Sequence, residues 1–237
     1  MTDAGGVVRP MLRLAIPVLV EQSLHVLVSI SDMVLTGQYF DQSHLAAVNL
    51  MSYLLWLITD LFLIVGIGST ALTARVTGAG NLPLARRVTN QSLVVGMFVA
   101  LAATTLALLG AGPIVRGLEL TGPSAQLAGT YLRIVSLVIP LVMIEAVGIA
   151  CLRRVGDTRS GMWVMIGVNL VNIAVSWGLV LGLGPLPKLG WSGIAIGTAC
   201  GHAFGGLSVL ALVLAGRAGM GLRWGLLVPD LSLIRRI

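Results

Sequence analysis

Residues 14–37 read LAIPVLVEQSLHVLVSISDMVLTG, an apolar stretch in which Glu21 and Asp32 are the only charged residues. A helix of about 20 mostly apolar residues is long enough to cross the hydrocarbon core of a bilayer. The stretch follows Arg9 and Arg13, but it is too long for a signal peptide and has no small-residue cleavage site before Asp32. It therefore predicts an uncleaved first transmembrane helix.

Five more apolar stretches follow, near 46–72, 89–111, 127–150, 162–184 and 191–215. Hydrophobic residues make up 57% of the chain and charged residues only 10%, and the mean hydropathy is +0.98. Soluble domains have about a quarter of their residues charged. The alternating pattern of membrane strands does not occur, and helices satisfy their own backbone in lipid. The sequence thus predicts an all-α integral membrane protein, a bundle of six transmembrane helices.

Basic residues are distributed unevenly between the two sides of the predicted spans. One side carries twelve of them: Arg9, Arg13, Arg75, Arg86, Arg87, Arg153, Arg154, Arg159, Arg217, Arg223, Arg235 and Arg236. The other side carries three: Arg116, Arg133 and Lys188. Because basic loops stay in the cytoplasm, we expect a multi-pass protein of the cell (inner) membrane with both termini cytoplasmic. The net charge of +6 then reflects this topology and contact with anionic lipid of the bilayer, and no nucleic-acid partner is expected.

The predicted loops are short and leave no room for a soluble catalytic domain; they lie at 38–44, 74–88, 112–126, 151–160 and 185–190. The nucleotide-binding pattern G-x-x-x-x-G-K-[ST] is absent. The two cysteines and three histidines lack the spacing of a metal or redox site, and no nucleophile shares a helix face with a base. We expect neither an enzyme nor a cofactor, and no structural metal.

Four carboxylates fall inside the apolar stretches: Glu21, Asp32, Asp60 and Glu145. A charge at bilayer depth costs at least about 2.5 kcal/mol, so each should face the bundle interior or a water-filled cavity, or be protonated. Glu21, His25 and Asp32 are spaced by four and then seven residues, which places them on one stripe of a helix. That spacing is compatible with one shared cavity. Glu21, His25, Asp60 and Glu145 are interpreted as cavity residues.

Asp32 is the strongest functional candidate of the four, because it has no basic residue within a helical turn and has hydroxyl neighbours at Ser29, Ser31 and Thr36. For the others a structural alternative stays open. Glu21 lies about two turns inside the predicted cytoplasmic end and can reach interfacial water. Glu145 lies about two turns before Arg153, which is a possible interfacial partner.

Residues 167–182 read GVNLVNIAVSWGLVLG, in which Asn169, Asn172 and Ser176 recur at helical spacing on one face. Their oxygens are of the hard type that Na⁺ or a hydrated proton accepts. Hydrogen bonds between helices are an equal alternative, and the same two readings apply to Thr198. The last span also carries a glycine every four residues, which predicts close helix packing; these glycines are Gly193, Gly197, Gly201 and Gly205.

Four segments together resemble the multidrug and toxic compound extrusion (MATE) transporters: LAIPVLVEQSLHVLVSISDMVLTGQ (14–38), GIGSTALTARVTGAGNLPLARRVTNQ (66–91), LRRVGDTRSGM (152–162) and NLVNIAVSWGLVLGLGPLPKLGWSGIAIGTA (169–199). The run L-R-x-x-G-D-T-R is the most specific of them. The resemblance covers nearly the whole chain in the family's order. The run itself is interpreted as a structural intracellular loop, held by ion pairs and contacting lipid phosphates.

The resemblance implies roles for individual residues. Asp32 matches an acidic residue in the family's first helix that is associated with H⁺ or Na⁺ coupling and with bending of that helix. Asn172 and Thr198 match polar residues beside the same site. Many relatives have a second aspartate where this chain has Ser176, so the cation affinity of a site formed by Asp32, Asn172, Ser176 and Thr198 should be lower.

The family has twelve helices in two lobes related by an axis along the membrane normal, and this chain corresponds to the N-terminal lobe. We expect a six-helix lobe over 1–222 and, over 223–237, the start of a connection to a missing seventh helix, because PDLSLIRRI near the end resembles PMLRLAI near the start. The expected partners are the bilayer, a small organic substrate, and either a C-terminal lobe or a second copy of the chain.

The leading hypothesis for function is one lobe of a secondary antiporter that exports amphipathic or cationic organic compounds in exchange for H⁺ or Na⁺. One alternative is a lipid-linked oligosaccharide flippase of the same superfamily, which should have a more cationic cavity. Another is a truncated, transport-inactive membrane interaction protein.

Overall fold

Seven helices form the computed structural model, which describes residues 4–78, 82–154, 156–216 and 230. They are α1 (Ala4–Tyr39), α2 (Gln42–Gly78), α3 (Leu82–Gly117), α4 (Gly122–Ser136), α5 (Ile139–Arg154), α6 (Thr158–Leu181) and α7 (Trp191–Leu214). Five helices are long and apolar enough to cross a membrane, and α4 with α5 makes a sixth crossing when counted as one bent span. No strand occurs in the described ranges. The prediction of an all-α bundle of six spans is confirmed.

The fourth predicted span, 127–150, is not one straight helix. It is divided between α4 and α5, whose axes meet at 61°. Pro140, near the start of α5, has no N–H to donate to the carbonyl of Ser136, and its ring would clash with that carbonyl in a continuous helix. Leu137 and Val138 instead donate three residues back, to Ile134 at 3.3 Å and Val135 at 3.0 Å. The proline thus sets the break.

Two of the predicted loops were too long. The region 74–88 is mostly helix, since α2 ends at Gly78 and α3 begins at Leu82, and 112–126 contains only a short connection at 118–121. The polar residues that suggested loops lie on helix turns that extend past the length needed to span a bilayer. The helices therefore continue into both polar regions.

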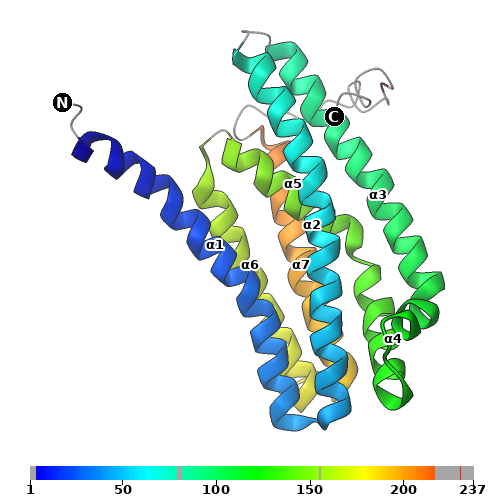
Figure 1. Cartoon of the computed structure of the whole chain (residues 1–237). Coiled ribbons are helices and arrows are strands. Elements are labelled where there is room, and N and C mark those ends of the chain that lie inside the picture. Colours follow the sequence, from blue (N-terminus) through cyan, green and yellow to red (C-terminus); the bar gives the residue numbers. More distant parts are fainter. Residues whose placement is uncertain (1–3, 79–81, 155, 217–229, 231–237) are drawn as a thin grey trace.

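The helices alternate in direction, so that the start of α1 and the α5–α6 connection lie at one end and the α1–α2 connection lies at the other (Figure 1). There Asp41 accepts backbone hydrogen bonds from Ser43 at 2.9 Å and His44 at 3.2 Å, which caps α2. The imidazole of His44 also bonds to Asp41 at 2.7 Å and holds the pKa of that carboxyl below its usual range.

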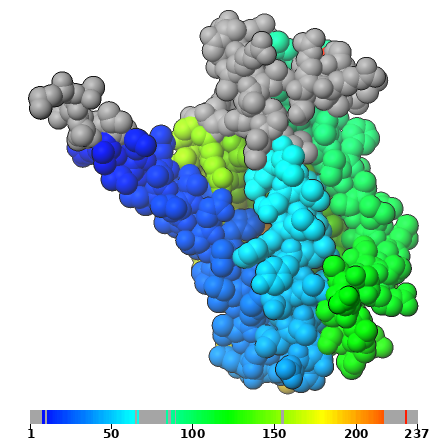
Figure 2. Space-filling view, in the orientation of Figure 1, coloured from blue at the N-terminus to red at the C-terminus, as the bar shows by residue number. Residues whose placement is uncertain are grey.

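The second half of α1 lies against α6, whereas its first half diverges from the bundle and leaves a notch beside α2 (Figures 1 and 2). Large apolar side chains on α1 and α2 are exposed, among them Met11, Leu19, Tyr53 and Ile64. Such surface is expected where helices face lipid or another apolar protein surface.

Helices α6 and α7 approach closely along the glycine stripe. A Cβ atom on Gly193 would lie 2.9 Å from the Cβ atom of Leu179, and one on Gly201 would lie 3.0 Å from the carbonyl oxygen of Val168. One on Gly197 would lie 2.7 Å from the backbone nitrogen of Ser176. The small residues therefore let two backbones meet at a distance that side chains would prevent.

Most of the predicted connection at 223–237 lies outside the described residues, as do the side chains of Arg75, Arg86 and Arg154. Asp230 is described, and its carboxylate forms an ion pair of 2.8 Å with Arg87 on α3. The backbone N–H of Asp230 also donates to Gln91 at 3.0 Å. Together these contacts place this position beside the start of α3.

Candidate functional site

Asp32 lies in the interior of the bundle with only 1% of its surface exposed. The hydroxyl of Thr198 donates to its Oδ2 at 2.5 Å, and the amide of Asn172 donates to its Oδ1 at 3.2 Å. The hydroxyl of Tyr131 lies 3.3 Å from Oδ2 and 3.1 Å from the Thr198 oxygen, so it can donate to either. Four helices thus contribute one polar side chain each to a single buried network.

The local sequence explains how the network is held. The hydroxyl of Thr36, one turn after Asp32, bonds back to the Asp32 carbonyl at 2.6 Å and does not compete for the carboxylate. Asn169 bonds to the carbonyl of Leu24 on α1 at 3.0 Å and to that of Met165 at 2.8 Å. Asn169 therefore joins α6 to α1, which is the packing alternative given for this residue. Asn172, on the same face of α6, then lies beside Asp32 of α1.

Three of the four predicted coupling residues, Asp32, Asn172 and Thr198, are hydrogen bonded to one another. Ser176 is not part of this network. It lies one turn further along α6, fully buried, and its hydroxyl has no partner in the described part of the chain. The Oδ1 atom of Asn172 is also without a partner. With the Oδ1 atom of Asn169, this face of α6 therefore has three buried oxygens that no group of the described protein satisfies.

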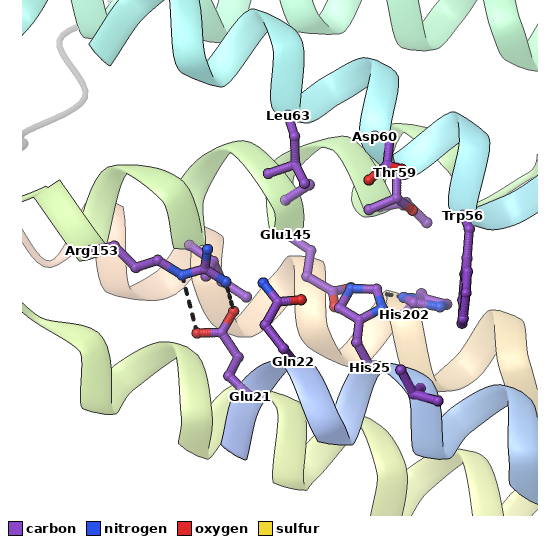
Figure 3. A pocket seen from close by; sticks show the side chains of 14 residues that line it. Glu21, Gln22, His25, Trp56, Thr59, Asp60, Leu63, Glu145, Arg153 and His202 are labelled. Atoms are coloured by element: carbon purple, nitrogen blue, oxygen red, sulfur yellow. Dashed lines mark hydrogen bonds and ion pairs between the residues drawn. The ribbon is translucent and has the colours of Figure 1, made fainter. Parts of the chain in front are cut away.

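The other predicted cavity residues, Glu21, His25, Asp60 and Glu145, line a second space, a cavity of about 180 Å³. In Figure 3 the side chains of α1 and of α2 face one another across it, with Glu145 of α5 and His202 of α7 between them. Asp60 is exposed to this space, in contrast to the three other carboxylates. Glu21, Asp32 and Glu145 are thus buried inside the bundle, as the cost of a charge in lipid requires.

Glu21 and Arg153 form an ion pair in this cavity, through two hydrogen bonds that Figure 3 draws as dashed lines. Glu21 is buried, and the Arg153 side chain is about one quarter exposed. Gly161 on α6 allows this, because a Cβ there would lie 2.5 Å from a Glu21 carboxylate oxygen. Two alternatives had stayed open, interfacial water for Glu21 and Arg153 as a partner for Glu145; in the structure Arg153 pairs with Glu21, and Glu145 bonds to His202.

Glu145 has a different partner. Its Oε2 lies 3.0 Å from Nδ1 of His202, and both side chains are only 3% exposed. The ring of His202 lies 6.2 Å from that of His25, measured between centroids. The Oε1 atom of Glu145 has no hydrogen-bond partner in the described part of the chain.

The stripe of Glu21, His25 and Asp32 lines two neighbouring spaces instead of one. A small cavity, with about 10 Å³ of room for water centres, touches Asp32, Tyr131 and Thr198. That room is about what one water molecule needs. His25, Trp56 and His202 line both spaces, so the histidines separate the Asp32 network from the larger cavity.

Tyr131 and His202 were not among the predicted site residues. A signal was present for Tyr131, since a tyrosine in an apolar helix needs a partner for its hydroxyl. His202 follows Thr198 by one turn on the same predicted helix face. Its partner Glu145 lies 57 positions away in the chain, and helical spacing alone does not reveal such a pair.

Together these features define a membrane-embedded helical protein with buried polar networks between its spans. The chain matches the MatE family model over residues 17–177. It therefore belongs to the MatE family, the family of multidrug and toxic compound extrusion transporters.

Known relatives agree with this assignment. An uncharacterized transporter of Bacillus subtilis, YisQ, is 28% identical over 83% of this chain and 43% of its own length. A probable multidrug resistance protein of Thermotoga maritima, NorM, is 28% identical over 94% of this chain and 48% of its own length. This chain spans about half the length of these relatives.

A solved structure shows the same fold. A transporter of the MOP superfamily from Pyrococcus furiosus superposes with a TM-score of 0.84 over 96% of this chain and 49% of its own chain, at 22% sequence identity. The similarity in fold supports the interpretation of this chain as one six-span lobe.

Proposed function

We propose that this chain is the ion-coupling lobe of an antiporter that exports amphipathic or cationic organic compounds in exchange for H⁺ or Na⁺. The observation that carries the proposal is the Asp32 carboxylate, buried among four helices with three polar donors around it. A buried ionisable group in a membrane bundle is expensive to keep and is most often part of an ion pathway. Four relatives are described as probable multidrug resistance proteins.

Binding of a proton or Na⁺ at Asp32 would change the hydrogen-bond network around this carboxylate. With no ion bound, the donors of Thr198, Asn172 and Tyr131 stabilise the carboxylate charge. A proton or Na⁺ at Asp32 would neutralise that charge and weaken the bonds between α1 and the helices α4, α6 and α7. Because Asp32 lies on α1, ion binding would shift the equilibrium between two ways in which α1 packs in the lobe.

The unpartnered oxygens of Asn172 and Ser176 favour an incoming cation. They are acceptors without donors, and a hydrated proton or Na⁺ supplies what they lack. Ser176 cannot supply a second charge, so affinity should be lower than in relatives with an aspartate there. The lobe would act together with a second lobe, which another segment or a second copy of this chain would supply.

Asp32→Asn tests the proposal, because it removes the charge and keeps the shape. In liposomes that contain the reconstituted protein, an inward gradient of H⁺ or Na⁺ should drive ethidium export, and the variant should export it at least about tenfold more slowly, as expected when a buried charge is removed from its network. Asp41→Asn, at an exposed aspartate in the α1–α2 connection, is the matched control and should export normally. Export by the Asp32 variant at the wild-type rate would contradict the proposal. If the wild-type protein moves no dye under either gradient with both lobes present, that result would instead favour a transport-inactive membrane interaction protein.

A further inference from the structure

A groove between α6 and α7, at the end where α6 begins, has a charged end and an apolar remainder. Its volume is about 610 Å³, and it shares no lining residue with the two cavities beside α1. We propose that this groove binds one anionic phospholipid, with Arg159 at the phosphate and Trp163 and Phe204 along an acyl chain. The proposal goes beyond the proposed transport function, because it assigns a lipid site to a surface that contains none of the coupling residues.

The charged end of the groove is formed by Arg159. This residue is exposed, and its side chain forms no hydrogen bond or ion pair within the described chain. The nearest carboxylate in the sequence, that of Asp157, instead accepts bonds from the backbone N–H of Ser160 at 3.1 Å and from its hydroxyl at 2.7 Å, which caps α6. The described residues that line the groove include no carboxylate. A lipid phosphate would therefore meet a guanidinium whose charge no lining residue balances, and guanidinium groups bind phosphate oxygens strongly.

The apolar part of the groove continues along the two helices, away from Arg159. Trp163 on α6 is 64% exposed and Phe204 on α7 is 43% exposed. A Cβ on Gly167, one turn after Trp163, would collide with the ring of Phe204, so the glycine lets that ring lie against α6. From Arg159 to Gly167 the axis of α6 rises about 12 Å, which is close to half of the roughly 30 Å hydrocarbon core. The groove therefore has the depth of an acyl chain within one leaflet.

A phospholipid matches this arrangement better than a free phosphate, because only the lipid has an apolar chain beside its phosphate. Arginine side chains near helix ends extend their charge to the membrane interface, and tryptophan is enriched at the same depth. The groove lies at the end where α1 also begins, which is the end predicted to be cytoplasmic (Figure 1). Basic pockets between helices on that side are where anionic lipid head groups bind. The charge and depth of the groove thus favour an anionic lipid of the inner leaflet.

Quenching of Trp163 fluorescence by brominated lipids tests the site, because bromine atoms on an acyl chain quench tryptophan only at close range. The whole 237-residue chain is reconstituted in phosphatidylcholine bilayers that contain a small fraction of dibrominated phosphatidylglycerol, or the same fraction of dibrominated phosphatidylcholine. The part of the quenching that is lost in Trp163→Phe reports the lipid in the groove. We expect the affinity derived from it to be about fivefold higher for phosphatidylglycerol, the preference that one arginine near a membrane surface gives.

Three variants assign the binding to this groove. Arg159→Gln, at an exposed position that should fold normally, should abolish the preference for phosphatidylglycerol. Arg9→Gln is the matched control, because it removes an exposed arginine of α1 at the same end and outside the groove, and it should keep the preference. Ala211→Leu enlarges an exposed residue of the groove lining and should lower the quenching by both brominated lipids.

The proposal is overturned if the two brominated lipids quench Trp163 equally in the wild type, or if Arg159→Gln and Arg9→Gln lose the preference alike, since surface charge in general would then explain it. Absence of quenching by either lipid would show that protein covers the groove, and competition by inorganic phosphate at constant ionic strength would show a site for phosphate alone; each result overturns the lipid site. Because no ion gradient is used, these outcomes do not depend on whether Asp32 couples export to an ion.

Discussion

Asn172 and Ser176 lie one turn apart on α6, yet their environments differ. The amide nitrogen of Asn172 donates to Asp32 and Thr198 at 3.2 Å each, while the hydroxyl of Ser176 has no partner within the described chain. Both side chains are fully buried. Burial alone therefore does not show which polar residue stabilises the lobe. The hydrogen bonds that each residue makes determine its contribution to stability.

Ser176→Ala should stabilise the protein by about 1 kcal/mol, the low end of the cost of a buried polar group without a partner, because it removes a buried hydroxyl that makes no hydrogen bond in the described chain. Thr198→Val is the matched comparison, since it removes a hydroxyl that donates to Asp32 at 2.5 Å. It should destabilise the protein by about 1–3 kcal/mol. Unfolding in mixed micelles, followed by circular dichroism, measures both values. Equal losses in the two variants would show that Ser176 has a bonded partner.

Arg153→Gln should destabilise the protein by about 3 kcal/mol, because it leaves the buried Glu21 carboxylate without its charge partner. Adding Glu21→Gln should restore much of that loss, since the pair is then replaced by two neutral side chains. Arg159→Gln, at an exposed arginine in the same region, serves as the control and should stay within about 0.5 kcal/mol. A double-mutant cycle in the same micelles gives the coupling. A coupling energy near zero would contradict a stabilising ion pair between Glu21 and Arg153.

At the scale of elements, the contact of α6 with α7 depends on the glycine stripe, and the break between α4 and α5 depends on Pro140. Within the stripe, the closest backbone contact is at Gly197, where a Cβ would lie 2.7 Å from the nitrogen and 2.9 Å from the Cα of Ser176. Backbone atoms cannot move aside as a side chain can. The stripe therefore fixes the distance between the two helices that present Asn172 and Thr198.

Gly197→Ala should destabilise the protein by about 1–3 kcal/mol, because the added methyl group forces α6 and α7 apart. It should also slow export, since Thr198 moves with α7. Gly129→Ala in α4 is the control, because a Cβ there meets nothing within 4 Å; alanine favours the helix there by about 0.5–1 kcal/mol. The same unfolding assay compares them. A Gly197 variant as stable as the wild type would show that the helices can separate freely.

At the scale of the whole molecule, the distribution of basic residues predicts which end is cytoplasmic. Arg9, Arg87 and Arg159 lie near the end where α1 begins, while Lys188 lies in the α6–α7 connection at the opposite end. The fold places these residues at two ends but does not orient those ends in a membrane. Both termini in the cytoplasm therefore remains a prediction from the positive-inside rule.

Cysteine labelling in intact cells tests this orientation. With Cys151 and Cys200 replaced by alanine, Asp41→Cys should react with a membrane-impermeant maleimide added outside, because the α1–α2 connection is predicted to be external. Arg159→Cys, at the α5–α6 connection, should react only after the cells are opened. The reverse pattern would invert the predicted topology and place the Glu21–Arg153 pair near the outer surface.

The sequence alone was enough to predict the six spans, the all-α class and the family, because each depends on local hydropathy or on motifs contiguous in the chain. It also identified Asp32, Asn172 and Thr198, since polar residues in an apolar helix are conspicuous. The same reasoning missed the break at Pro140 and overestimated two loops. Prolines can be accommodated in membrane helices, and polarity does not distinguish a loop from a helix turn in water.

Only the tertiary structure decided how the polar residues are paired. Helical spacing places Glu21, His25 and Asp32 on one stripe, but the register of the neighbouring helices determines that Glu21 meets Arg153, 132 positions away, and that Glu145 meets His202. The packing of the helices also leaves Ser176 outside the Asp32 network and brings Tyr131 into that network. These contacts join residues far apart in the chain, so they depend on the distances and angles between packed helices, which local sequence patterns do not contain.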